Sequence, residues 1–243
     1  MRAVDAALAA VGFLTRVPVR RALGAEDVSR GAVVFPLVGA GVGALSGVAV
    51  LVLYPSVPAL AAAGVAVAVE VVITGAMHVD ALADTADAAG AQTREQALEI
   101  MRDSRIGSFG AAALVVDLLT RAAAIAGLAG SPVAALVAAG ALSRAASLPL
   151  AAAMPYARAE GGPGSVLTGR VGWTSAVVAV LVALVVAIGA SGLDGLWAAA
   201  AAAGTALVLG LVFRRWLGGV TGDALGAVTE LSGTVVLLVL VAT

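Results

Sequence analysis

The chain has 243 residues, of which 61% are hydrophobic and 12% charged, and its mean hydropathy is +1.07. This composition exceeds that of ordinary globular proteins and indicates that lipid forms part of the solvent. A net charge of −1 and an aromatic content of 4% argue against a nucleic-acid partner. Because there is no cysteine and a single histidine, His78, the sequence excludes disulfides, thiolate metal sites and multi-histidine zinc centres.

The first apolar stretch covers about residues 3–14 and is short. Asp5 interrupts its start, and no small-residue cleavage site is evident before Arg16. We therefore expect an amphipathic helix that lies on a membrane surface rather than a signal peptide.

Further segments are apolar over roughly the 20 residues that a membrane-spanning helix needs. They cover residues 31–54, 58–78, 107–129, 132–153, 174–192, 195–213 and 224–243. The sequence therefore predicts an all-α, polytopic integral membrane protein with about seven spans, within a range of six to eight. We expect residues 1–243 to form a single membrane-embedded domain.

The positions of arginine predict how these spans are oriented, since cytoplasmic loops are enriched in basic residues. The chain has no lysine, and its arginines cluster in loops that pairs of spans separate. These are Arg16, Arg20, Arg21 and Arg30; Arg94, Arg102 and Arg105; Arg158 and Arg170; and Arg214 and Arg215. The opposite turns, at residues 54–58, 130–132 and 191–195, contain no arginine. We expect a multi-pass protein of the bacterial cytoplasmic membrane, with the long loops in the cytoplasm.

The densest acidic cluster follows the second predicted span. Asp80, Asp84 and Asp87 are spaced i, i+4, i+7, which places their side chains within an arc of roughly 60° on a helix. A divalent cation would relieve the repulsion between them, and carboxylate oxygens are the ligands that Mg²⁺ prefers. The sequence predicts a magnesium site here; the alternative is a solvated helix end at the membrane surface.

A second string, Met101-Arg102-Asp103-Ser104-Arg105, precedes the third span. Arginine presents a planar fork that matches phosphate. The small residues Gly107, Ser108 and Gly110 would let an anion approach a helix N-terminus. The string predicts a phosphate-binding loop, although arginines here also suit ordinary flanking of a span.

Two more loops have weaker signals. Residues 155–164 read as a flexible loop that closes over a substrate or as a plain connection, and residues 214–223 join two arginines to a glycine-rich turn that ends in Asp223.

Ionisable residues inside predicted spans are costly and by default suggest function. Asp117 and Arg121 are spaced i, i+4 and could form an ion pair or contact substrate. Arg144 and Glu70 have no local partner and could pair with each other across helices.

Read together, these strings resemble the cobalamin synthase family, the adenosylcobinamide-GDP ribazoletransferases. The strings that carry the resemblance run in the family's order and cover nearly the whole chain. They lie at residues 13–19, 35–39, 74–87, 99–107, 143–144, 155–158 and 218–227. Ala81 and Ala88 stand where the family usually has glycine, and Arg121 where it often has lysine. Glu70 and Asp117 match no family position.

The resemblance implies a phosphoryl-group transfer that joins α-ribazole or its 5′-phosphate to adenosylcobinamide-GDP and releases GMP, in the nucleotide-loop assembly of cobalamin. In that reaction we expect Asp80, Asp84, Asp87 and Asp103 to hold one or two Mg²⁺ ions on the diphosphate. One of these carboxylates or His78 would take the proton of the attacking hydroxyl. Arg102 and Arg105 would bind the substrate phosphates and the departing GMP. Ser104 and Arg158 would be further substrate-binding residues, and Asp223 would complete the substrate site from the last loop.

Two other functions fit parts of the pattern. A membrane CDP-alcohol-type phosphotransferase also uses aspartates on one helix face with magnesium, but its longer signature is absent. A small-molecule transporter would suit the polytopic topology, although transporter sites usually lie near the midplane. A homo-oligomer and contacts with other corrinoid-pathway enzymes are further expectations.

Overall fold

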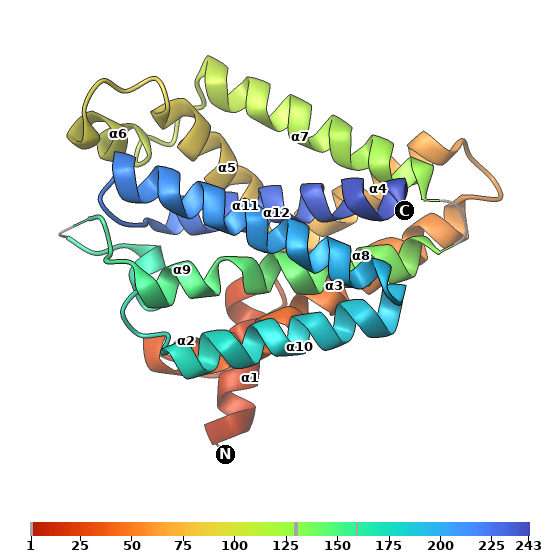
Figure 1. Ribbon diagram of the computed structural model, residues 1–243, viewed down its shortest axis with the longest axis horizontal. Coiled ribbons are helices and arrows are strands. Elements are labelled where there is room, and N and C mark those ends of the chain that lie inside the picture. The colour runs from red at the N-terminus through yellow and green to blue at the C-terminus, as the bar shows by residue number, and fades with distance from the viewer. Residues whose placement is uncertain (1, 129–130, 159) are drawn as a thin grey trace.

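The computed structural model describes residues 2–128, 131–158 and 160–243, which form a bundle of helices (Figure 1). Within these residues there is no β-sheet, only an isolated parallel bridge between Tyr156 and Val220. The elements are α1 Arg2–Leu14, α2 Ala25–Gly31, the 3₁₀ turn η1 Ala32–Val34, α3 Phe35–Leu53, α4 Ala59–Thr74, α5 Met77–Ala88, α6 Arg94–Ile100, α7 Ser108–Gly127, α8 Pro132–Ala146, α9 Leu148–Ala153, the 3₁₀ turn η2 Pro163–Val166, α10 Trp173–Ser191, α11 Asp194–Trp216 and α12 Gly222–Ala242.

Six helices are long and apolar enough to cross a membrane, which confirms the all-α, polytopic prediction. They are Ala25–Leu53, Ser108–Gly127, Pro132–Ala153, Trp173–Ser191, Asp194–Trp216 and Gly222–Ala242. Ala129, where the third predicted span ends, and Gly130 of the predicted turn lie outside the described residues. The predicted N-terminal helix is present as α1, and its place on a membrane surface stays a prediction.

The predicted span at 58–78 is wrong as a single straight helix. α4 ends at Thr74, and α5 leaves it at an angle of 92°. At 1.5 Å per residue, the 16 residues of α4 extend about 24 Å, less than the roughly 30 Å of a bilayer core.

Two consecutive left-handed residues make this bend. Gly75 has φ 65° and Ala76 has φ 62°, and Ala76 is the only non-glycine residue with positive φ in the described chain. A residue with a Cβ in this conformation costs roughly 1–2 kcal/mol, so the surrounding packing must hold the turn in place.

The arginine-rich connections gather at one end of the bundle. In Figure 1, α6, the C-terminal end of α9 and the α11–α12 turn lie at that end, whereas the α3–α4 and α10–α11 turns lie at the other. This arrangement agrees with the prediction from arginine. The assignment of the arginine-rich end to the cytoplasm stays a prediction.

α3 and α8 approach each other closely through glycine. Gly39 and Gly43 lie one turn apart on α3, and a Cβ on them would stand 2.0 Å from Gly140 O and 2.0 Å from Leu136 O. Small residues four apart let membrane helices approach closely, where apolar packing against lipid gives little driving force. These glycines therefore fix α8, which carries Arg144, against α3.

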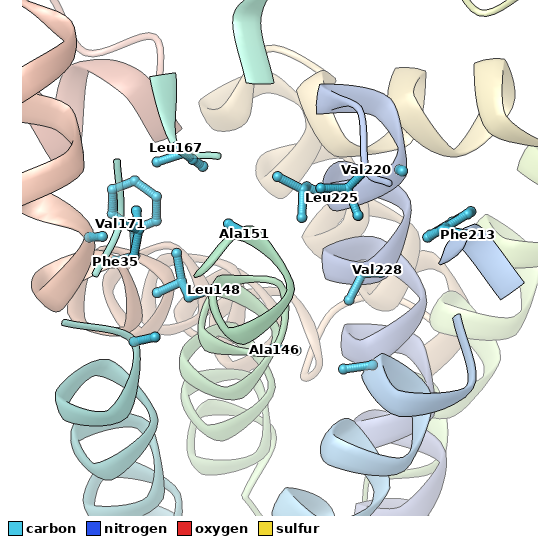
Figure 2. Packing of buried hydrophobic residues seen from close by; sticks show 14 of the residues in the cluster. Phe35, Ala146, Leu148, Ala151, Leu167, Val171, Phe213, Val220, Leu225 and Val228 are labelled. Carbon is cyan, nitrogen blue, oxygen red and sulfur yellow. The ribbon is translucent and has the colours of Figure 1, made fainter. Parts of the chain in front are cut away.

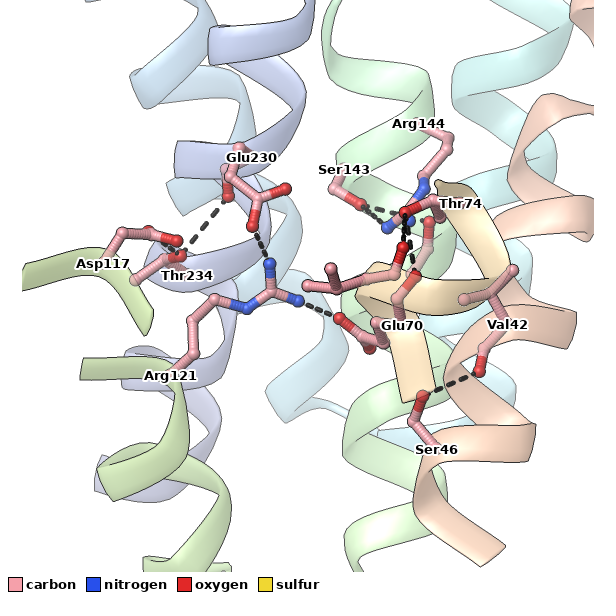
Figure 3. A network of polar contacts seen from close by, with 12 residues as sticks. Val42, Ser46, Glu70, Thr74, Asp117, Arg121, Ser143, Arg144, Glu230 and Thr234 are labelled. Carbon is pink, nitrogen blue, oxygen red and sulfur yellow. Dashed lines mark hydrogen bonds and ion pairs between the residues drawn. The ribbon is translucent and has the colours of Figure 1, made fainter. Parts of the chain in front are cut away.

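The buried charges pair differently from the prediction (Figure 3). Arg121 of α7 lies between two carboxylates and forms ion pairs with Glu70 of α4 and Glu230 of α12. Asp117 instead accepts a hydrogen bond of 2.5 Å from Thr234 Oγ1. The predicted pairs Asp117–Arg121 and Glu70–Arg144 are therefore both wrong, because α7 packs against α4 and α12 together and gives Arg121 two partners outside its own helix.

The apolar core near the arginine-rich end fastens the loops as well as the helices. Leu167 and Val171, from the loop between α9 and α10, are buried in the same cluster as Phe35, Leu148 and Leu225 (Figure 2). The second half of this loop is therefore packed into the protein.

Arg121→Leu should destabilise the protein strongly, because it leaves two carboxylates buried without a cation; removing one partner of a buried pair costs roughly 3–5 kcal/mol. Arg121→Lys keeps the charge and should lose much less. Thermal unfolding in detergent measures both, with Arg214→Leu as control because Arg214 is an exposed arginine near the end of α11. An unchanged Tm in Arg121→Leu would contradict a stabilising role for the triad.

Candidate active site

A cavity of about 370 Å³ lies where the start of α5, the start of α12 and α8 meet the segment after α1. Its polar lining comes from segments far apart in the sequence. The charged and ionisable residues are Arg16, His78, Asp80, Arg144 and Asp223. Three predicted site residues, His78, Asp80 and Asp223, therefore share one cavity.

α5 carries the predicted acidic face as a single helix. Asp80 is exposed, Asp84 and Asp87 are half-buried, and the first-turn His78 is buried. The Asp84 carboxylate interacts electrostatically with Asp80, Asp87 and also with Asp223 of α12. The cluster thus gains a fourth carboxylate that lies far away in the sequence.

Ala81 and Ala88, which depart from the family pattern, lie within the regular helix α5 and are buried. Ala81 packs on Gly226 of α12, where an added Cβ would stand 2.4 Å from the Ala81 Cβ. The small residue of this helix contact is thus on α12, so α5 does not need glycine at 81.

Asp87 binds the start of α7. Its carboxylate accepts hydrogen bonds of 2.7 Å from both Gly107 N and Gly110 N. A Cβ at these glycines would stand 2.5 and 2.3 Å from the Asp87 oxygens. An anion does lie at this helix N-terminus, as the sequence suggested, but in this structure it is the Asp87 side chain rather than a phosphate.

The predicted phosphate-binding string lies outside the cavity, in the exposed connection from α6 to α7. Arg105 Nη2 lies 2.6 Å from Asp103 Oδ2, and its hydrogen bonds lower the pKa of Asp103 to about 2, so this carboxylate is ionised at neutral pH. Arg102 lies 3.2 Å from Glu160, and Ser104 is exposed. Of the predicted magnesium ligands, Asp103 is thus paired with a cation and separate from the acidic face of α5.

The loop at residues 155–164 contacts the turn at residues 214–223, the two loops for which the sequence gave only weak indications of function. Arg158 Nη2 lies 2.7 Å from Asp223 Oδ2, which links two predicted substrate-binding residues from different loops. Beside them, Ala157 N donates to Val220 O at 2.9 Å and Val220 N to Pro155 O at 3.0 Å. Residues 155–158 are therefore held against the start of α12 rather than free.

Arg94 fastens this junction, and the sequence reading gave it no role beyond topology. Its Nε donates to Leu217 O at 2.7 Å and its Nη2 to Ala157 O at 2.9 Å. One side chain from α6 thus holds both loops that carry Arg158 and Asp223. No sequence signal distinguishes Arg94 from other loop arginines, because its partners are backbone carbonyls.

α12 begins with a capped turn that positions Asp223. The Thr221 side chain accepts a hydrogen bond of 3.0 Å from Ala224 N, and Asp223 lies in the first turn, where the helix dipole favours negative charge. The Thr-Gly-Asp string noted in the sequence is therefore a helix start that places a carboxylate on the cavity.

Magnesium suits these donors, although the protein does not form a complete cage for it. Among residues 2–128, 131–158 and 160–243, no three carboxylate or imidazole groups are placed to hold one ion together. Mg²⁺ commonly binds one or two carboxylates and completes its shell with water and substrate phosphate. Asp80, Asp84 and Asp223 are the carboxylates near the cavity that could contribute in this way.

Two cavity arginines were not predicted as site residues. In the sequence, Arg16 indicates only topology and Arg144 a pair with Glu70, yet both residues line the cavity. Both belong to strings that carry the family resemblance, Phe13-Leu14-Thr15-Arg16 and Ser143-Arg144. Membership of these strings is the sequence feature that could have identified them as site residues.

Residues 6–241 match the family model described as cobalamin-5-phosphate synthase. The chain is 40% identical over 241 residues to the adenosylcobinamide-GDP ribazoletransferases of Escherichia coli O45:K1 (strain S88 / ExPEC), Escherichia coli (strain K12 / DH10B) and Shigella flexneri. Each match covers 96% of this chain and 97% of the relative. No solved structure matches the chain.

The match spans every element from α1 to α12 and includes all the residues of the cavity. The chain therefore belongs to the cobalamin-5-phosphate synthase family.

Proposed function

We propose that this membrane transferase joins α-ribazole, or its 5′-phosphate, to adenosylcobinamide-GDP and releases GMP. Membership of the family and the name of its relatives support this reaction. The observation that carries it is the cavity, which brings His78 and Asp80 of α5 together with Asp223 of α12. Carboxylates around a partly enclosed space suit a reaction that must neutralise a diphosphate and accept a proton.

In this reaction a ribose hydroxyl oxygen attacks the phosphorus next to the cobinamide. The bond from that phosphorus to the bridging oxygen breaks, a new phosphodiester forms, and GMP leaves with the electron pair. Mg²⁺ bound through one or two of the carboxylates of Asp80, Asp84 and Asp223, with water and substrate phosphate as its other ligands, would neutralise charge on the diphosphate. The chain itself positions the hydroxyl in line and accepts its proton.

The proton acceptor is one of the groups on α5. Asp80 is exposed on the cavity and Asp84 lies one turn further along the same face. His78 is buried in the first turn and also lines the cavity. We propose these three as the candidates for this role, and Asp87 is the least suited because both its oxygens bind backbone N–H groups.

Arg102 and Arg105 would bind phosphate from the exposed α6–α7 connection. Both are paired with nearby carboxylates, Glu160 and Asp103, at the surface. Exposed ion pairs contribute little to stability, commonly about 0–1 kcal/mol. A substrate phosphate could therefore replace these partners at small cost.

We further propose that the cavity end of the bundle faces the cytoplasm of a bacterial cell, since the arginine-rich connections lie at that end. The substrates then reach the site from the cytoplasm. Assembly into a homo-oligomer and contact with other corrinoid-pathway enzymes belong to the same proposal.

Chelation should abolish turnover. Purified protein in detergent or liposomes, given adenosylcobinamide-GDP and α-ribazole, should release GMP and form the corrinoid product only with Mg²⁺ present. Chromatography of both products measures this. Absence of product from folded protein at every metal concentration would contradict the reaction and favour a lipid-alcohol substrate or transport.

Asp84→Asn should lower kcat by about 10²–10⁴-fold, the usual contribution of a group that moves a proton, while Tm stays near that of the wild type. Turnover near the wild-type level would remove Asp84 from the mechanism.

Asp87→Asn should instead lower Tm. One of the two N–H groups at the start of α7 then loses its acceptor, which costs about 1–3 kcal/mol if that group stays buried. Gly110→Ala should reproduce this effect, because its Cβ would stand 2.3 Å from Asp87 Oδ2. Loss of turnover with an unchanged Tm in Asp87→Asn would make Asp87 a metal ligand rather than a clamp.

A further inference from the structure

Arg144 is a buried cation whose guanidinium is largely unpaired. Arg144 is only 8% exposed, yet it lines the cavity. Within the described residues, its one hydrogen-bond acceptor is Ser143 Oγ, at 2.9 Å, and no carboxylate forms an ion pair with it. Glu70 and Glu230 form their ion pairs with Arg121 and act on Arg144 only electrostatically, from beyond ion-pair distance (Figure 3).

Arg16 lines the same cavity from the segment after α1. Its backbone N–H donates to Ile73 O at 2.7 Å, which ties this segment to the end of α4. Its side chain crosses Gly75, where an added Cβ would stand 1.9 Å from Arg16 Nε. The absence of a side chain at 75 therefore lets the Arg16 guanidinium lie against the bend.

Hydroxyl groups accompany Arg144. Thr229 Oγ1 lies 3.1 Å from Ser147 Oγ, and both residues line the cavity. Ser147 follows Arg144 by three residues, about one helical turn. This part of the cavity thus combines a guanidinium with hydroxyl donors, which is the donor set that phosphate oxygens accept.

The group of Arg144, Ser147 and Thr229 is separated from the Asp223 carboxylate. Asp223 and Thr229 both line the cavity and lie six residues apart on α12, about 9 Å at 1.5 Å per residue. The cavity therefore extends from Asp223 at the start of α12 to the Thr229, Ser147 and Arg144 group deeper in the bundle. An anion near Arg144 would be clear of the Asp223 carboxylate.

We propose that Arg16 and Arg144 form a phosphate-binding subsite within the cavity, separate from Arg102 and Arg105. Arg121 and Arg144 share the charge of Glu70 and Glu230, but only Arg121 contacts them, so an anionic ligand would give the Arg144 guanidinium a direct counter-charge. The proposal rests on the proposed function, which offers two sources of phosphate: the 5′-phosphate of ribazole phosphate and the diphosphate of adenosylcobinamide-GDP. In the first case the subsite holds one side of the ribose while its reacting hydroxyl lies toward the carboxylates.

The test compares Arg16→Gln and Arg144→Gln with the wild type in steady-state kinetics, using α-ribazole and α-ribazole 5′-phosphate in turn with adenosylcobinamide-GDP. A 5′-phosphate in the subsite predicts a KM rise of about 10- to 100-fold for the phosphorylated acceptor alone, as expected from lost hydrogen bonds to a charged group. A diphosphate in the subsite predicts a KM rise for adenosylcobinamide-GDP with either acceptor. Arg144→Lys should recover part of the loss.

Arg214→Gln is the matched control, since Arg214 is exposed and lies outside the cavity, and it should leave every KM unchanged. Arg16 is exposed at the cavity, so Arg16→Gln keeps the test valid if Arg144→Gln fails to fold. Unchanged KM values for all three substrates in a folded Arg16→Gln variant would overturn the subsite.

Equilibrium dialysis with α-ribazole 5′-phosphate and with adenosylcobinamide-GDP separates failure of the subsite from failure of the reaction, because binding needs no turnover. Weaker binding of either one in both Gln variants supports the subsite even if the wild type forms no product. Equal binding of both by wild type and variants would overturn the subsite while leaving the reaction intact.

Discussion

The left-handed turn at Gly75-Ala76 is the constraint on which the site depends. A straight continuation of α4 would carry His78 and Asp80 along the bundle, away from the start of α12. The 92° bend instead lays α5 across α12, where Ala81 packs on Gly226 and the two helix starts face one cavity. Arg16 crosses the same turn because residue 75 has no side chain. One strained dipeptide therefore positions residues from three segments.

The buried charges explain how such a bend is maintained among apolar helices. Lipid offers no hydrogen bonds, so Glu70 and Glu230 must find a cation within the protein. Arg121 satisfies both and joins α4, α7 and α12 at one point. Glu70 holds α4 shortly before the bend at Gly75. Glu230 holds α12 about two turns after Asp223. The three residues of the ion triad do not themselves line the cavity, but they hold α4 and α12, which both contribute to its wall.

The sequence predicted the helical spans, the single end for arginine and the shared face of Asp80, Asp84 and Asp87, because each follows from a periodicity or from local composition. It failed where partners come from distant helices. Asp117 and Arg121 are correctly spaced for a pair, yet Arg121 has better partners across the bundle. The bend was not predicted because an apolar run does not indicate the backbone φ angles of its residues. Alanine, as at Ala76, does not normally mark a left-handed turn.

The arginines near the site differ in burial, and this difference determines how strongly each would bind an anion. Arg102 and Arg105 lie in solvent, already paired, and can exchange partners cheaply. Arg144 is buried with most of its donors unused, so it gains far more from an anion in a medium of low dielectric. The exposed pair Arg102 and Arg105 therefore suits the transient binding of a substrate that must also leave, whereas the buried Arg144 suits accurate positioning of a phosphate. Asp80 of α5 and Asp223 of α12 line the same cavity as Arg144, so the groups suited to a hydroxyl and to a phosphate share one space.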